Sequence, residues 1–184
     1  MEPQPLSAPL ADPLYYLENF CTVLAWVGTH HADLLTDAER ARLAEFEALP
    51  RPAQALLVRM VMRSGTLFRQ GKLRYPELGA PVAETLEMLS TGGWIDPDPA
   101  LSLEEFFTLM TRLDLVEALA SSGVTRGWTK RAMYQALSTA GLAPAPLAPW
   151  WPAGAARGGQ PTHMGTVHLL RVAVLGYTPP ALAA

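Results

Sequence analysis

Apolar residues recur three and four positions apart through most of the chain up to residue 142, which is the spacing of helices with one buried face. Asp12 followed by Pro13 is a typical helix start. Thr36 with Glu39 and Ser102 with Glu105 match the capping box. The expected helices cover residues 13–30, a segment after Thr36, residues 52–63, a segment from Pro81 to Gly92, segments starting at Ser102 and Thr111, and residues near 129–140.

Strand-like patterns are short and fall between these helices. Thr66–Arg69 and Lys72–Tyr75 follow the turn at Ser64, and in the second piece charged and apolar side chains alternate. We expect the two pieces to form a β-hairpin. Trp94 and Ile95 indicate a further brief strand, and the segment 167–175 is the single strand candidate near the C-terminus.

This order of elements predicts a mainly α fold: a winged-helix-like helical domain with a short β-hairpin, followed by a small helix–loop–helix. We expect the first domain to cover residues 13–110 and the helical pair residues 111–142. Residues 1–12 and 143–184 are rich in Pro and Ala, and residues 143–184 contain no Asp, Glu or Lys. Both ends are therefore expected to be mostly disordered, low-complexity tails.

The composition narrows the functional classes. The chain has 184 residues, 49% of them hydrophobic, which is enough for one domain or two small ones. A net charge of -3 excludes a uniformly basic surface but leaves room for a local basic patch. Cys21 is the only cysteine, so an internal disulfide framework is excluded. No apolar run or basic leader predicts a membrane span or a signal peptide, so we expect a cytoplasmic protein.

Basic residues are concentrated in one part of the chain, which we call the basic run, residues 51–74. No acidic residue lies between Glu47 and Glu77, whereas that interval holds six cations: Arg51, Arg59, Arg63, Arg69, Lys72 and Arg74. Arginine can grip phosphate oxygens through two parallel hydrogen bonds. The basic run therefore predicts contact with a phosphate backbone. The alternative is an ordinary solvated face, with some arginines paired to carboxylates such as Glu84 or Glu105 after folding.

A second basic group consists of Arg126, Lys130 and Arg131 at the start of the last expected helix. It predicts a weaker phosphate contact, and the alternative is an ordinary exposed helix start. The helix that follows the expected hairpin carries Glu84 and Glu87, so base-specific readout from that helix is not expected. Backbone and shape recognition is the more plausible mode.

Few residues suit catalysis or metal binding. His30 and His31 are neighbours at a helix end, where a capping role is favoured over metal ligation. His163 and His168 fall in the C-terminal tail. The sequence has no G-x-S-x-G, phosphate loop, H-E-x-x-H or Glu-x-Lys. We therefore expect no catalytic residue, no metal site and no cofactor in this chain.

Several segments together resemble one known family. They are PLYYLENF at Pro13–Phe20, GWID at Gly93–Asp96 and the long run LPRPAQALLVRMVMRSGTLFRQGKLRYPELG at Leu49–Gly79. The chain resembles the N-terminal DNA-binding region of bacterial Fanconi-associated nuclease over about residues 13–142. Leu115–Leu119 and Gly127–Lys130 resemble that family's SAP-like helix–loop–helix.

The resemblance implies a structure-specific nuclease that acts on 5′ flapped or branched DNA during interstrand cross-link repair. In that family, DNA is cleaved by a C-terminal virus-type replication-repair nuclease domain that uses Mg²⁺ or Mn²⁺. A helical-repeat domain lies between the N-terminal region and this nuclease domain. Neither domain is found here, so none of the family's metal-binding residues is carried over. The expected partner is flapped or branched DNA, bound without sequence preference by Arg59, Arg63, Arg69, Lys72, Arg74, Arg126, Lys130 and Arg131.

The C-terminal tail does not match the helical continuation that the resemblance implies. We therefore expect a truncated or frame-shifted product, or a fragment, that is inactive alone, is associated with the bacterial nucleoid and has the missing helical-repeat and nuclease domains as further partners. The alternative is a protein–protein interaction or scaffold domain that does not bind DNA. Its mark would be exposed apolar surface.

Overall fold

The computed structural model describes residues 12–139, 141–150 and 169–172. It divides into two compact units. In its described part, unit 1 contains residues 12–64 and Arg74–Trp94, and unit 2 contains Gly65–Leu73 and residues 95–139, 141–150 and 169–172. None of the described helices combines the length and the apolar character that crossing a membrane requires.

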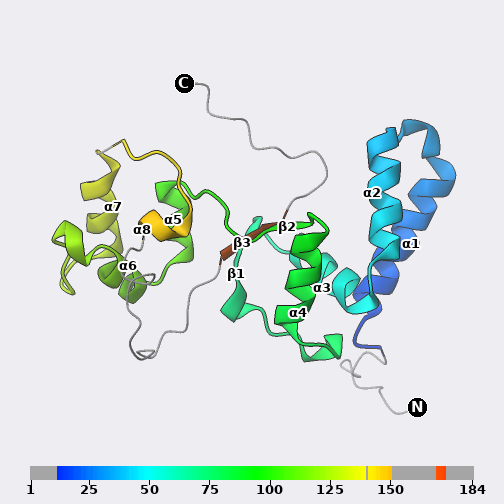
Figure 1. Cartoon of the computed structure of the whole chain (residues 1–184), viewed down its shortest axis with the longest axis horizontal. Helices are drawn as coiled ribbons and strands as arrows, with labels where there is room; N and C mark the ends of the chain where they lie inside the picture. The colour runs from blue at the N-terminus through cyan, green and yellow to red at the C-terminus, as the bar shows by residue number, and fades with distance from the viewer. Residues whose placement is uncertain (1–11, 140, 151–168, 173–184) are drawn as a thin grey trace, which may run out of the picture. The chain divides into compact units, whose positions relative to one another are not determined.

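Unit 1 is built from helices. They are α1 (Tyr15–His30), α2 (Asp37–Ala48), α3 (Arg51–Val61) and α4 (Val82–Thr91), with short 3-10 turns at Ala32–Leu34 and Pro76–Leu78 (Figure 1). Helix α3 is central because it packs against both α1 and α4. Its buried side includes Leu56, Val58 and Met60, whereas Arg59 on the same helix stays partly exposed. The predicted helical periodicity is thus confirmed for this unit.

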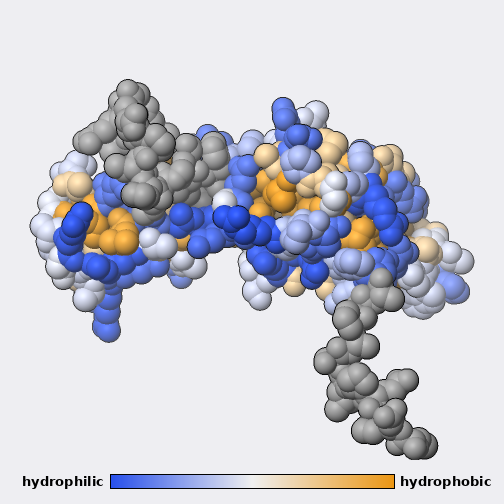
Figure 2. Space-filling view, turned by 90° about the horizontal axis from the view of Figure 1, so that it is seen from below, coloured by the Kyte–Doolittle hydropathy of each residue, from blue (hydrophilic) through white to orange (hydrophobic). Residues whose placement is uncertain are grey.

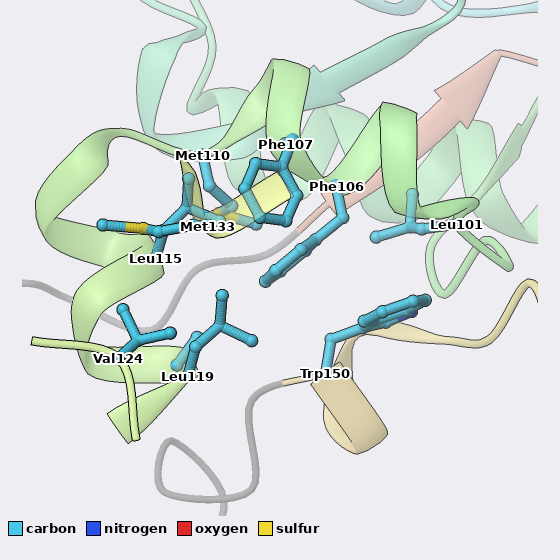
Figure 3. Packing of buried hydrophobic residues seen from close by; sticks show 10 residues of the cluster. Leu101, Phe106, Phe107, Met110, Leu115, Leu119, Val124, Met133 and Trp150 are labelled. Atoms are coloured by element: carbon cyan, nitrogen blue, oxygen red, sulfur yellow. The ribbon is translucent and has the colours of Figure 1, made fainter. Parts of the chain in front are cut away.

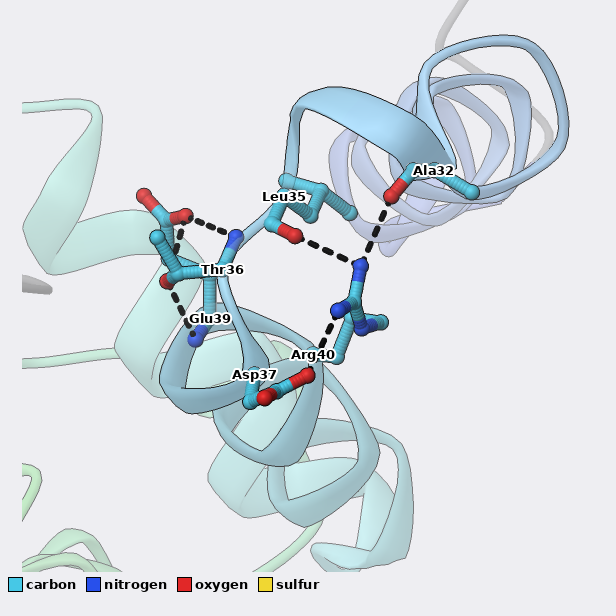
Figure 4. A network of polar contacts seen from close by, with 6 residues as sticks. All are labelled: Ala32, Leu35, Thr36, Asp37, Glu39 and Arg40. Carbon is cyan, nitrogen blue, oxygen red and sulfur yellow. Dashed lines mark hydrogen bonds and ion pairs between the residues drawn. The ribbon is translucent and has the colours of Figure 1, made fainter.

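The start of α2 shows why its sequence forms a helix there. Thr36 and Glu39 form the predicted capping box: the Thr36 hydroxyl accepts from the Glu39 backbone N–H at 3.2 Å, and the Glu39 carboxylate accepts from the Thr36 N–H at 2.8 Å (Figure 4). Arg40 donates to the carbonyls of Ala32 and Leu35 at 2.8 and 2.5 Å. The turn between α1 and α2 is therefore held by side chains of α2 itself.

Unit 2 contains α5 (Leu103–Leu109), α6 (Arg112–Ala118), α7 (Lys130–Ser138) and α8 (Leu147–Trp150). Their apolar faces meet in one cluster, in which Phe106 and Trp150 stack with ring centroids 5.3 Å apart (Figure 3). Leu119, Val124 and Met133 belong to the same cluster, so α6, the loop after it and α7 share a core. Capping boxes at Ser102 and Thr111 begin α5 and α6.

Unit 2 also holds a three-stranded antiparallel sheet. Strands β1 (Leu67–Arg69) and β2 (Ile95–Asp96) both pair with β3 (Leu169–Val172), which gives the order β1-β3-β2. Phe68 lies opposite Leu170, and Ile95 lies opposite Val172; all four are buried. Directly paired residues share one face of a sheet, so these apolar side chains set the register.

Three features differ from the sequence-based expectations. Residues Gln70–Lys72 form a 3-10 turn, so the second half of the expected hairpin is missing and β1 pairs with β3 instead. Helix α5 belongs to unit 2 rather than to the first expected domain. Within the segment 143–184, which was expected to be mostly disordered, α8 and β3 are ordered, and β3 lies in the predicted strand segment 167–175.

Apolar contacts and backbone hydrogen bonds explain the order near residue 145. Leu101 and Ala145 exchange two backbone hydrogen bonds of 2.7 and 3.0 Å. The Trp150 indole N–H donates to the Ala145 carbonyl at 3.0 Å while its ring is buried. Composition alone does not reveal such anchors. The rest of segment 143–184, and residues 1–11 of the expected N-terminal tail, lie outside the described residues.

Candidate nucleic-acid interface

The predicted DNA-facing residues of the basic run do not all lie in the same unit. Arg59, Arg63 and Arg74 belong to unit 1, whereas Arg69 and Lys72 belong to unit 2. The single surface that the sequence predicts from α3 and a hairpin is therefore not given by either unit alone. Each cation is best judged by its own surroundings.

Arg59 lies in a polar cluster at the side of α3. Its guanidinium carbon is 4.0 Å from the centroid of the buried Tyr16 ring, and one of its nitrogens is 3.2 Å from the Glu77 carboxylate. Burial raises the pKa of the Tyr16 phenol, and the Arg59 cation opposes that rise. Arg59 thus compensates a carboxylate and stacks on an aromatic ring. Its contact with DNA stays a prediction.

Arg69 forms a shorter ion pair than Arg59 does, and its partner is a fully buried carboxylate. Its Nη1 is 2.6 Å from Oδ2 of Asp114, a side chain with 0% exposure. The Asp114 carboxylate also accepts from the Thr111 backbone N–H at 2.8 Å. Burial disfavours the charged form of Asp114, but the hydrogen bonds from Thr111 and Arg69 outweigh this and lower the pKa of the carboxyl. Arg69 therefore joins β1 to the start of α6, and DNA contact by it stays a prediction.

A second arginine on the sheet makes the corresponding contact at α5. Arg171 of β3 donates to the Glu105 carboxylate at 2.9 Å and to the Ala100 carbonyl at 3.0 Å. Arg69 and Arg171 lie on one face of the sheet, since Arg171 is opposite Leu67, two residues from Arg69. Glu105 and Asp114 are both capping-box residues. The sheet is thus tied to α5 and α6 through the carboxylates that also cap these helices.

The remaining cations of the basic run are exposed. The Arg63 guanidinium carbon is 5.5 Å from the centroid of the Tyr75 ring, and the Arg63 residue is exposed. Lys72 and Arg74 are also exposed. Among the ion pairs between described residues, none involves these three side chains. They remain able to meet an external anion.

The second basic group, Arg126, Lys130 and Arg131 at the start of α7, which we call the α7 cluster, is more open than the basic run. Arg126 and Arg131 are exposed and Lys130 is half-buried. Within the described part of the chain, no carboxylate forms an ion pair with any of the three. Glu117 is the last acidic residue of the sequence, so no carboxylate follows it in the chain. The sequence predicts the weaker phosphate contact for this group, yet its cations have the fewest ion pairs with the described carboxylates of the chain itself.

The loop that carries Arg126 is fixed to the rest of unit 2. Val124 inserts into the core cluster with 7% exposure. Arg112 of α6 donates through Nη1 to the Arg126 carbonyl at 2.6 Å. Thr129 caps α7 by accepting from the Ala132 backbone N–H at 3.1 Å. The cations of the α7 cluster therefore project from an anchored backbone.

Sequence reasoning missed two contributors beside the α7 cluster. Arg112 is exposed and supplies both a positive charge and the loop anchor. Trp128, which lies between Arg126 and the start of α7, has 38% exposure although it is a large aromatic side chain. The close spacing of Arg126, Trp128 and Lys130 is the signal from which this combination of cations and an aromatic residue could have been found.

The described residues offer no metal centre. Across residues 12–139, 141–150 and 169–172, no group of three His, Cys, Asp or Glu side chains is placed to hold an ion. The His30 Nδ1 is 3.0 Å from the Trp26 carbonyl at the end of α1, where the sequence predicts a capping role. His163 and His168 lie outside the described residues. The described side chains do not fit a divalent-cation site, and catalysis by the chain stays untested.

Comparison with known families assigns both parts of the chain. The family described as "FAN1, HTH domain" matches residues 14–96, and the family described as "Fanconi anemia-associated nuclease SAP domain" matches residues 100–150. A Fanconi-associated nuclease 1 homolog of Pseudomonas aeruginosa is 52% identical over 114 residues, which is 61% of this chain and 20% of that protein. A homolog of the same name from Oryza sativa subsp. japonica is 32% identical over 81 residues, 44% of this chain and 8% of that protein.

Solved structures give the same result. The crystal structure of paFAN1 bound to DNA with a 2-nucleotide 5′ flap and a gap matches with a TM-score of 0.77 and 37% identity, over 90% of this chain and 28% of that one. The complex with a 1-nucleotide 5′ flap matches with a TM-score of 0.74 and 37% identity, over 88% and 28%. The chain thus spans between 8% and 28% of the length of the relatives named here.

Proposed function

Because the chain belongs to the Fanconi-associated nuclease family, of which it carries the helix–turn–helix and SAP domains, we propose that it is a DNA-binding region for flapped or branched DNA. The observation that carries the proposal is the likeness to paFAN1 held on 5′ flap DNA, over 90% of the chain at 37% identity. In a longer protein, this region would hold DNA for a structure-specific nuclease in interstrand cross-link repair.

The surface chemistry supports backbone recognition. Six predicted DNA-facing cations form no ion pair among the described residues: Arg63, Lys72, Arg74, Arg126, Lys130 and Arg131. A phosphate that replaces water around such a cation releases condensed counterions, which drives binding and makes it salt-dependent. Helix α4 exposes Glu84 and Glu87, so close approach of that face to bases is disfavoured. Shape and charge are the expected determinants.

The chemical step belongs elsewhere in this proposal. The described residues provide no metal site. The resemblance to the nuclease family implies that phosphodiester hydrolysis there needs Mg²⁺ or Mn²⁺. We expect the region to bind DNA without cutting it. Incubation of flap DNA with the chain and Mn²⁺ should leave the strands intact, and specific cleavage in a purified preparation would contradict this part of the proposal.

The scaffold alternative is less favoured. Figure 2 shows hydrophobic residues at the surface in patches among hydrophilic ones. The exposed large apolar side chains are spread over several elements, with Val23 and Trp26 on α1, Met62 after α3 and Leu113 on α6. Single apolar side chains of this kind are usual on soluble domains. The DNA-bound relatives favour the nucleic-acid function.

A titration of labelled DNA tests the proposed function. Flap DNA and a fully paired duplex of unrelated sequence should both bind, and affinity should fall steeply between low and physiological salt. Changing the base sequence at constant shape should matter little. An absence of binding at low salt, with the protein shown to be folded by circular dichroism, would overturn the proposal.

A further inference from the structure

Two exposed tryptophans differ in what occupies their ring faces. Trp26 has 53% exposure, but it stacks on His30 with centroids 5.2 Å apart and meets His31 at 4.9 Å. Trp128 has 38% exposure and, among the described side chains, neither an aromatic ring nor a cation stacks on it. Trp128 thus offers a ring that no described aromatic or cationic group covers.

The backbone around Trp128 is held in place before any ligand arrives. The Trp128 N–H donates to the Thr125 carbonyl at 3.1 Å, which closes a turn. Val124 is anchored in the core, and the Arg126 carbonyl accepts from Arg112 at 2.6 Å. A side chain on such a loop loses little additional backbone freedom when it binds, and a tryptophan ring has only two side-chain torsions to fix.

The surroundings of Trp128 suit one kind of ligand. Arg126 precedes it by two residues and Lys130 follows it by two, and neither is paired with a carboxylate among the described residues. A partly exposed aromatic ring, with an uncompensated cation two residues away on either side in the sequence, suits a nucleotide, whose base stacks on the ring while its phosphates meet cations.

Whether a base can stack on the Trp128 ring depends on whether that base is paired in a duplex. Bases inside a duplex are already stacked on their neighbours and expose only their edges to a protein. An unpaired nucleotide at a flap or gap has a free face. We propose that Trp128 stacks on an unpaired base, and that it thereby favours DNA with a single-stranded segment over fully paired DNA. This inference rests on the proposed function and deepens it.

The test compares two DNAs and two substitutions in the full chain. Trp128→Leu keeps an apolar side chain and removes the aromatic face, whereas Trp128→Phe keeps a smaller aromatic face. Fluorescence anisotropy at one salt concentration gives the affinities for labelled flap DNA and for the matched paired duplex. We expect Trp128→Leu to weaken flap binding about fivefold or more, in keeping with the energy of base–aromatic stacking, and to change duplex binding less than about twofold. Trp128→Phe should retain most of the flap affinity.

Trp26→Leu is the matched control, because it removes an exposed tryptophan from unit 1 and should leave both affinities unchanged. Quenching of intrinsic tryptophan fluorescence by a short oligothymidine gives a second readout, which should be lost in Trp128→Phe. Circular dichroism checks that each variant is folded.

Each remaining outcome has a definite meaning. Equal weakening of flap and duplex binding in Trp128→Leu, or no change in either, overturns the inference while the proposed function stands. Failure of the unaltered chain to bind any DNA overturns both. An unchanged quenching signal in Trp128→Phe likewise contradicts stacking on this ring.

Discussion

The basic run and the α7 cluster differ in what their cations do inside the folded chain. In the basic run, Arg51 pairs with Glu18, Arg59 with Glu77 and Arg69 with Asp114. The α7 cluster has no such pairs among the described residues. The density of basic residues in a sequence therefore differs from the number of cations that folding leaves without a carboxylate, and we predict that the second quantity decides which cations contact DNA.

The difference follows from where the carboxylates come from. The basic run lacks acidic residues of its own, but folding brings Asp114 to Arg69 from 45 residues away. The α7 cluster lies beyond the last acidic residue of the sequence, and no described carboxylate forms an ion pair with it. The Arg51–Glu18 and Arg59–Glu77 pairs form within unit 1, and the Arg69–Asp114 pair forms within unit 2, so compensation in the basic run depends on how each unit folds.

The largest expected effect comes from breaking the most buried pair. Arg69→Met should destabilise unit 2 by about 3–5 kcal/mol, because it leaves the Asp114 carboxylate buried without a cation. Oδ1 of that carboxylate already has no hydrogen-bond partner among the described residues. Urea unfolding followed by circular dichroism measures the loss of stability.

Arg126→Met is the matched control for this prediction. It removes a charge of the same kind from an exposed side chain, so its stability should equal that of the unaltered chain within error. Equal stabilities of Arg69→Met and Arg126→Met would show that Arg69 is not held as we describe.

The same pair predicts a smaller, pH-dependent effect. The pKa of Asp114 is lowered in the folded chain, where hydrogen bonds from Thr111 and Arg69 outweigh the cost of burial. Its ionised form therefore contributes stability above the unfolded pKa of an aspartate, about 4, and this contribution is lost as the pH falls through the lower folded value. Asp114→Asn should flatten the acid limb of a stability-against-pH curve, and an unchanged acid limb would contradict the assignment.

The smallest effect concerns the loop of the α7 cluster. Thr129→Ala removes the cap of α7 and should cost about 1 kcal/mol. Thr129→Ser keeps a hydroxyl and should behave like the unaltered chain. Thermal unfolding measures both variants, and equal losses in the two would show that the hydroxyl bond does not hold the helix start.

Local sequence features predicted local structure well. The capping boxes at Thr36 and Ser102 and the strand within 167–175 are all confirmed, because each depends on residues that are close in the sequence. Strand partners were not predictable in this way. The alternation at Lys72–Tyr75 suggested a hairpin, but β1 pairs with β3 because Phe68 and Leu170, more than a hundred residues apart, bury a common face.

The site was predictable only in part for the same reason. Basic residues can be counted in a sequence, but whether Arg69 is free depends on Asp114, and the position of Asp114 depends on packing of α5 and α6. Trp128 reads as a core residue by hydrophobicity alone. In the structure Trp128 has 38% exposure, whereas Val124 in the same loop is buried.

The salt dependence of flap-DNA binding tests the central claim most directly. Two double variants remove the same charge: Arg126→Gln with Arg131→Gln from the α7 cluster, and Arg51→Gln with Arg59→Gln from the paired cations of the basic run. We expect the first to reduce the slope of log affinity against log salt by about two units, and the second to leave it nearly unchanged. Equal reductions in the two variants, or a larger one in the second, would contradict the account.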